Sequence, residues 1–194
     1  MNVNNLTKIL NANNGYITTK EIDENVVSKT YIPELIKQGL IRKVSNGLYI
    51  DNNLIEDEYY ILQRRYKDII FSYNTAFHLL GLSERAPYKI DITTINHKQI
   101  NEDLNIHYIS KEKLNIGVIE IQSPYSNPIK IYNAERCICD MLKNQNEYDI
   151  ETYNKIINKY FNSKNKNIIL IDEYAKEFNV YEKLTTIKDV LMKL

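Results

Sequence analysis

The stretch from Thr19 to Ile50 constrains the fold more than any other part of the chain, because it encodes several short elements in a fixed order. The residues Thr18-Thr19-Lys20-Glu21 have the Ser/Thr-x-x-Glu spacing of a capping box, which predicts the start of a helix. Asn25 would end this helix after about two turns. Ser28 then offers a good N-cap for a second helix.

The second helix has an apolar side and a polar side. Ile32, Leu35 and Ile36 lie at i, i+3 and i+4, which predicts one buried stripe. Pro33 removes a backbone donor, and it is tolerated because it falls near the first turn, where several N–H groups lack partners in any helix. The opposite side is left for a partner and carries Thr30, Tyr31, Glu34, Lys37 and Gln38.

A hairpin follows the second helix. Gly39 supplies the stop, and β-rich residues 40–44 and 48–50 flank Ser45-Asn46-Gly47. Asn-Gly predicts a type I′ turn, in which both central residues have positive φ.

An amphipathic first helix, with Val3, Leu6, Ile9 and Leu10 on one side, precedes this stretch. Gly15 ends it, and Tyr16-Ile17 adds a short strand. Three helices and a hairpin in this order predict a winged helix-turn-helix over residues 1–50.

This architecture predicts double-stranded DNA as a partner. The helix that begins at Ser28 would lie in the major groove, and the hairpin, which is the wing, would lie along the backbone or in the minor groove. Residues 26–50 carry four cations against one anion, a net charge of +3. Glu34 would repel phosphate, however, and winged helices also serve as protein-interaction modules, so that alternative stays open. The expected DNA-binding residues are Lys29, Thr30, Tyr31, Glu34, Lys37, Gln38, Arg42, Lys43, Ser45 and Asn46.

The polar residues 51–53 predict the start of a helix that runs to about Lys67. Its last turn carries Arg64, Arg65 and Lys67, which has two interpretations. The cations could complement the helix dipole at a solvated end, or they could form a second phosphate-contacting patch beside the wing. The sequence does not decide between the two.

Composition excludes several classes of protein. Lys plus Arg and Asp plus Glu are both 25, so total charge does not indicate a polyanion partner. The sequence has no signal segment and no apolar run of membrane-spanning length, which predicts a cytoplasmic protein. Cys137 and Cys139 would point to different faces of a helix, so no disulfide is expected between them.

Period-two runs near residues 88–95, 106–109, 117–122 and 129–132 predict a small, mainly antiparallel sheet. From Asn133 onward the apolar spacing becomes helical, and Arg136 and Asp140 form an ordinary i, i+4 helix pair. The alternative is a recognition surface formed by Glu135, Arg136 and Asp140. Strands followed by helices predict an α+β fold with a C-terminal set of helices, in a second domain over residues 51–194.

The chain resembles the AbiEi family, the antitoxins of type IV toxin-antitoxin (abortive infection) systems, over essentially its full length. The resemblance rests on the Gly15–Ile50 stretch and on three further blocks, SYNTAFHLLGL at 72–82, APYKIDITT at 86–94 and YNAERCICDML at 132–142. Many relatives place a cation before the glycine of the wing turn, where this chain has Asn46.

The resemblance implies an autorepressor whose winged helix binds inverted repeats in its own promoter, as a monomer or as a dimer. It implies a C-terminal domain that counters a nucleotidyltransferase toxin without forming a stable complex with it. No cofactor and no metal are implied, and the expected protein is not an enzyme.

A metal-dependent nuclease is the alternative, since Asp91 and Glu120-Ile121-Gln122 faintly resemble an Asp…Glu-x-Lys site. Gln122 stands where such a site needs a cation. No Gly-Ser turn followed by Asp-x-Asp and no phosphate-binding glycine loop occurs in the sequence. His78, His97 and His107 are too far apart in the chain to form a local ligand pair.

Overall fold

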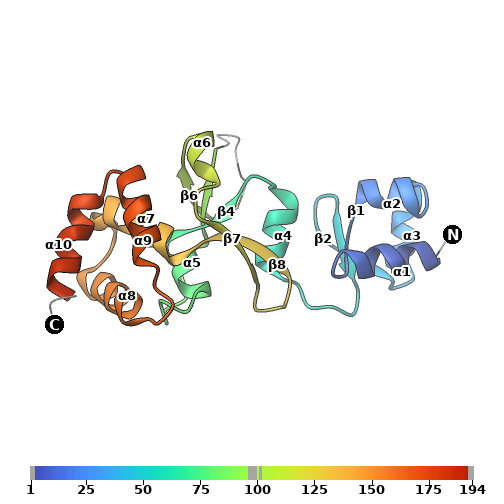
Figure 1. Ribbon diagram of the computed structural model, residues 1–194. Coiled ribbons are helices and arrows are strands. Elements are labelled where there is room, and N and C mark those ends of the chain that lie inside the picture. The colour runs from blue at the N-terminus through green and yellow to red at the C-terminus, as the bar shows by residue number, and fades with distance from the viewer. Residues whose placement is uncertain (1–2, 96–99, 101, 192–194) are drawn as a thin grey trace. The chain divides into compact units, whose positions relative to one another are not determined.

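The computed structural model describes residues 3–95, 100 and 102–191, and the fold is α+β (Figure 1). The chain divides into two compact units. The first unit contains Met1–Lys67 and Gln122–Ile129, and the second contains Asp68–Ile121 and Lys130–Leu194. The division therefore lies further along the chain than the predicted boundary at residue 50, and one hairpin tip returns to the first unit.

The first unit combines helices with a three-stranded antiparallel sheet of order β1-β3-β2. Its strands are β1 (Tyr16–Thr18), β2 (Ile41–Ser45) and β3 (Leu48–Asp51). Its helical segments are α1 (Val3–Ala12), α2 (Thr19–Asn25), the 3₁₀ turn η1 (Lys29–Tyr31), α3 (Ile32–Lys37) and α4 (Glu58–Arg65). Its core contains Leu6, Leu10, Ile17, Ile22, Ile32, Leu35, Ile41 and Tyr49.

The start of α2 confirms the predicted capping box. The Glu21 backbone N–H donates to Thr18 Oγ1 at 3.2 Å, and the Thr18 backbone N–H donates to Glu21 Oε2 at 2.7 Å. These reciprocal bonds satisfy two donors that the first turn of a helix leaves without backbone partners. The helix ends at Asn25, as the sequence predicts.

The helix predicted from Ser28 is instead divided into η1 and α3. In an α-helix residue 33 would donate to the Lys29 carbonyl, but Pro33 has no N–H. The Ile32 N–H donates to that carbonyl instead, which makes the first turn a 3₁₀ turn. Asp23 Oδ1 accepts from the Lys29 N–H at 2.8 Å, so Asp23 rather than the Ser28 side chain caps this segment.

The division of the helix changes which residues are buried. Ile32 and Leu35 pack into the core, with 7% and 0% of their surface exposed. Ile36 is 39% exposed, so the expectation that it completes the buried stripe is wrong. Because α3 holds only six residues, Ile36 lies in its last turn, at the margin of the core.

The turn between β2 and β3 lies where Asn46-Gly47 predicts it, but its geometry differs. Gly47 has φ +73°, whereas Asn46 is not among the described residues with positive φ, so the predicted type I′ turn is wrong. A register shift between Lys43 and Ser45 accompanies the turn. Such a bulge increases the local twist, which a type I′ turn would otherwise supply.

The fourth helix, α4, begins at Glu58 and ends at Arg65, so it is shorter than the predicted helix from residues 51–53 to Lys67. Asp57 caps it, because its Oδ1 accepts from the N–H groups of the first turn at 3.1 and 3.2 Å. Asp57 Oδ2 also accepts from Asn127 Nδ2 at 2.7 Å and from the Ser123 hydroxyl. This fully buried carboxylate therefore fixes the 122–129 hairpin tip to the start of α4.

The second unit contains a five-stranded sheet of order β6-β5-β4-β8-β7. The prediction of a mainly antiparallel sheet is wrong: β4 and β5 are antiparallel, but β4 with β8 and β5 with β6 are parallel. Alternating burial records which face of a strand is covered, and it carries no information about strand direction. The strands are β4 (Ile70–Phe71), β5 (Asp91–Thr94), β6 (Asn105–Tyr108), β7 (Val118–Gln122) and β8 (Pro128–Tyr132).

Helices α7 to α10 follow the sheet, in the order that the apolar spacing predicts. Their apolar sides, together with α5, form the core of the second unit. Cys137 and Cys139 on α7 are buried free thiols, and burial raises the pKa of each thiol. The helices are α5 (Tyr73–Leu79), α6 (Lys111–Leu114), α7 (Ala134–Lys143), the 3₁₀ turn η2 (Gln145–Glu147), α8 (Ile150–Asn162), α9 (Ile168–Glu177) and α10 (Tyr181–Leu191).

The Arg136–Asp140 pair is buried, which supports its structural interpretation over a recognition surface. Arg136 is 1% exposed, and its Nε donates to Asp140 Oδ2 at 2.9 Å. The guanidinium carbon lies 4.2 Å from the centre of the Tyr132 ring and 4.0 Å from that of Phe178. The pair therefore belongs to the core and is not available to a partner.

Candidate nucleic-acid interface

The predicted recognition surface is an exposed face on η1 and α3. Ile32 and Leu35 attach these two segments to the core, and the other side chains of both segments are exposed. We call these exposed side chains, together with Gln38, the η1–α3 face. Its predicted DNA-binding residues, all exposed, are Lys29, Thr30, Tyr31, Glu34, Lys37 and Gln38.

Glu34, the anion that argues against phosphate contact, has a local partner. Gln38 Nε2 donates to Glu34 Oε1 at 2.9 Å, one turn further along the chain. The bond occupies one carboxylate oxygen but leaves its negative charge in place. Lys29 and Lys37 thus outnumber Glu34 on this face, so its net charge is mildly positive.

The four predicted contacts on the β2–β3 hairpin comprise two exposed residues and two that are partly buried. Lys43 and Asn46 are exposed. Arg42 lies on the other side of β2, where its guanidinium pairs with Glu56 and donates to the Leu54 carbonyl at 2.9 Å. Ser45 Oγ is buried, with no hydrogen-bond partner among the described residues.

Alternation along a strand explains this difference, because neighbouring side chains point to opposite faces. With Lys43 turned outward, Arg42 must turn toward the 54–56 segment. The sequence showed two adjacent cations but not the acceptors that one of them would meet.

The second predicted patch, at the end of α4, is mostly engaged within the first unit. Arg64 Nη2 lies 3.1 Å from Glu21 Oε2, which links α4 to the capping box of α2. Burial opposes ionisation of Glu21, but hydrogen bonds from Thr18 and the Arg64 charge outweigh it and lower the pKa of the carboxyl. The Arg65 guanidinium lies 5.1 Å from the Tyr66 ring centre, and Lys67 is exposed. The patch thus offers one exposed lysine, not three cations.

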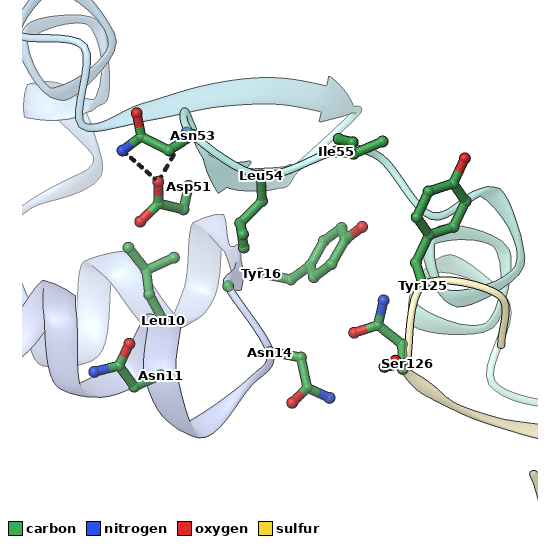
Figure 2. A pocket seen from close by; sticks show the side chains of 12 residues that line it. Leu10, Asn11, Asn14, Tyr16, Asp51, Asn53, Leu54, Ile55, Tyr125 and Ser126 are labelled. Atoms are coloured by element: carbon green, nitrogen blue, oxygen red, sulfur yellow. Dashed lines mark hydrogen bonds between the residues drawn. The ribbon is translucent and has the colours of Figure 1, made fainter. Parts of the chain in front are cut away.

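A cavity in the first unit has no counterpart in the sequence analysis (Figure 2). Its volume is about 850 Å³, and its rim includes Leu54, Ile55 and Tyr125, which are 44%, 71% and 52% exposed. A Cβ on Gly15 would lie 2.0 Å from Leu54 Cδ1, so the loop after β3 packs directly on that glycine. Some polar residues of the lining are bonded to neighbours: Asn53 Nδ2 donates to Asp51 Oδ1 at 3.1 Å, and Asn127 Nδ2 donates to Asp57 Oδ2 at 2.7 Å.

The nuclease alternative required Asp91 and Glu120 to share a metal ion. Asp91 lies on β5 and Glu120 on β7, and two further strands, β4 and β8, separate them in the sheet. Three strand spacings amount to about 14 Å, far more than the two ligands of one ion can span. The structure therefore does not bring this pair together.

Asp91 has a different partner, His107 on the neighbouring strand β6, with 3.1 Å between Oδ1 and Nε2. The two residues come together because β5 and β6 are parallel neighbours. The sequence did not predict this pair, because the residues are far apart in the chain. His78 is half-buried, and His97 lies outside the described residues. No group of three or more possible metal ligands gathers anywhere in the described ranges.

Across the residues that the structure describes, none of the helices has the length and apolar character needed to cross a membrane.

Comparison with protein-family models and with curated proteins finds no match. Among solved structures, the chain is similar to that of the RV2827C protein from Mycobacterium tuberculosis, with a TM-score of 0.60. The match covers 90% of this chain and 71% of that chain, at 11% sequence identity. At this identity the likeness supports the fold alone.

Proposed function

We propose that the first unit is a winged helix-turn-helix that binds double-stranded DNA, and that the protein is an autorepressing antitoxin. The single observation behind the DNA-binding half is the η1–α3 face, which offers lysines, a hydroxyl and an amide to solvent while its underside is held by the core. The order of helices and hairpin supports placing this face in the major groove, with Lys43 and Asn46 beside the backbone or in the minor groove.

Phosphate contacts in this proposal come from Lys29, Lys37 and Lys43. Lysines on phosphates supply affinity by releasing counterions, and base-edge contacts from Thr30 and Tyr31 select the sequence. Arg42 has a structural role in this proposal, because its guanidinium pairs with Glu56 and donates to the Leu54 carbonyl.

Three lysines on one domain give weak binding, so the proposal includes two copies on an inverted repeat in the promoter. Two linked contacts raise the apparent affinity without any new contact type.

The antitoxin half rests on the similarity of four sequence blocks to the AbiEi family. In this proposal the second unit acts in the cytoplasm and counters a nucleotidyltransferase toxin without a stable complex. Cells that are arrested by the nucleotidyltransferase toxin should resume growth when this protein is co-expressed. The two proteins should not co-purify. Continued growth arrest would remove this half of the proposal and leave the DNA-binding half standing.

The DNA-binding test measures the affinity of the full chain for the DNA upstream of its own gene at several salt concentrations. Replacing Lys29, Lys37 and Lys43 with alanine should weaken binding to all DNA and lower the salt slope by about 0.9 for each lost phosphate contact. A matched control replaces three exposed lysines of the second unit, Lys111, Lys159 and Lys164. Unchanged affinity in the first variant, or equal loss in both, would mean that the η1–α3 face and the wing do not bind DNA.

A protein-interaction module is the second candidate, and the exposure of Tyr31 and Ile36 favours it. These side chains, 55% and 39% exposed, add apolar surface to a face that DNA would contact mainly through polar groups. Aromatic residues are enriched where proteins bind one another. The two candidates separate if the full chain shifts no DNA from its own locus but Tyr31→Ala disrupts a protein complex.

A further inference from the structure

Asp91 is a buried carboxylate whose hydrogen bonding is incomplete. The residue is 2% exposed, and its Oδ1 faces His107 Nε2 at 3.1 Å. Its Oδ2 is also buried, and it has no hydrogen-bond partner among the described residues. Because an unsatisfied buried acceptor destabilises a fold, and a charged one does so most, such a group calls for an explanation.

The carboxylate borders a cavity of about 540 Å³ within the second unit, which we call the Asp91 cavity. This volume falls within the range of small-molecule sites. The described lining is rich in oxygen and amide groups and contains a second acid, Glu147, but neither lysine nor arginine. Asn74, Asn105 and His107 also belong to this polar lining.

Aromatic rings form part of the cavity wall. The rings of Tyr73 and His107 are stacked, with centroids 3.7 Å apart and an angle of 17° between their planes. Tyr148 contributes a buried hydroxyl that, like Asp91 Oδ2, has no hydrogen-bond partner in the described part of the chain. Two unsatisfied polar atoms from separate elements thus belong to residues that line the same cavity.

The backbone beside the cavity is strained. Tyr73 has φ +47°, a left-handed conformation that aromatic residues rarely adopt. Its hydroxyl accepts a hydrogen bond from Asn144 Nδ2 at 2.7 Å, which helps to hold the ring against His107. Strain of this kind persists where the surrounding structure holds it, and it is concentrated at functional sites.

We infer that the Asp91 cavity binds a small organic cation, a molecule carrying a protonated amine or a guanidinium group. The cationic group donates a hydrogen bond to Asp91 Oδ2 and supplies a positive charge that the described lining residues do not. Its carbon chain packs against the side chains of Tyr73 and Tyr148, which belong to the cavity lining. An anionic ligand is disfavoured, because Asp91 and Glu147 would both repel it.

Putrescine and agmatine are suitable probes, and 1,4-butanediol is a neutral molecule of the same length as putrescine. We expect saturable binding of at least one cation to the full chain by calorimetry, and no binding of the diol. Asp91→Asn keeps the side-chain shape but removes the charge, and it should weaken cation binding by about tenfold or more. The matched control, Asp103→Asn, changes an exposed acid and should bind the cation normally.

Thermal unfolding distinguishes a ligand site from a structural carboxylate. If the Asp91 carboxylate serves to bind a ligand, Asp91→Asn should leave the unliganded protein as stable as the parent protein or more stable. The proposal fails if this variant lowers the melting temperature in the absence of ligand, since Asp91 would then act through its His107 bond. It fails equally if neither cation binds up to about 10 mM, or if the diol binds as well as the cations.

Discussion

The η1–α3 face and helix α7 both carry charged or polar side chains four residues apart, yet the two regions use them in opposite ways. Beside the exposed Glu34–Gln38 pair of α3, Lys29 and Lys37 are also exposed. On α7 the Arg136–Asp140 pair is buried, and two backbone carbonyls and two aromatic rings complete its surroundings. The same spacing therefore occurs on an exposed surface in one helix and in the core in the other.

The largest expected effect comes from breaking the buried pair. Arg136→Ala leaves Asp140 without its counter-charge in a buried site, and it should destabilise the protein by about 3–5 kcal/mol in urea unfolding. The matched control is Lys155→Ala on α8, which removes an i, i+4 pair with Glu151 that is exposed on both sides. Equal loss in the two variants would contradict the contrast between buried and exposed pairs.

A second, smaller effect concerns Glu21, which links the capping box of α2 to Arg64. Its pKa is lowered in the folded protein, so its contribution to stability is complete above the ordinary glutamate pKa of about 4.3 and is lost as the pH falls through the folded value. Glu21→Gln should cost about 1 kcal/mol at neutral pH.

Melting temperatures of the parent protein and Glu21→Gln, measured between neutral and acidic pH, test this prediction. The difference between the two should shrink as the pH falls below the folded pKa of Glu21. A constant difference over the whole range would mean that the Glu21 charge does not stabilise the fold.

The smallest effect on stability is expected at the exposed lysines. Lys37→Ala and Lys43→Ala should each change the free energy of unfolding by less than about 0.5 kcal/mol, because both side chains are exposed to solvent. If urea unfolding shows a decrease in the free energy of unfolding well above that value, the lysine stabilises the fold, as Arg42 and Arg64 do.

Local signals in the sequence predicted local structure well. The Thr18–Glu21 capping box, the end of α2 at Asn25 and the position of the hairpin at Asn46-Gly47 all depend on residues close together in the chain. The order of strands and helices and the α+β class follow from periodicity in the same way.

Long-range partners could not be predicted, because periodicity does not say which residues meet. The Arg42–Glu56 and Arg64–Glu21 pairs turned two predicted DNA contacts into structural links. The Asp91–His107 pair depends on parallel strand pairing, which alternation in the sequence does not reveal. For Arg136, nothing in the i, i+4 spacing distinguishes a buried pair from an exposed one.

We propose that the η1–α3 face and the turn between β2 and β3 bind DNA. Amide chemical shifts of the full chain, followed while DNA from its own promoter is added, test that claim most directly. We expect shifts concentrated over residues 28–38 and at Lys43, Asn46 and Gly47, and little change along α7. Shifts confined to the second unit, or to the end of α4, would contradict it.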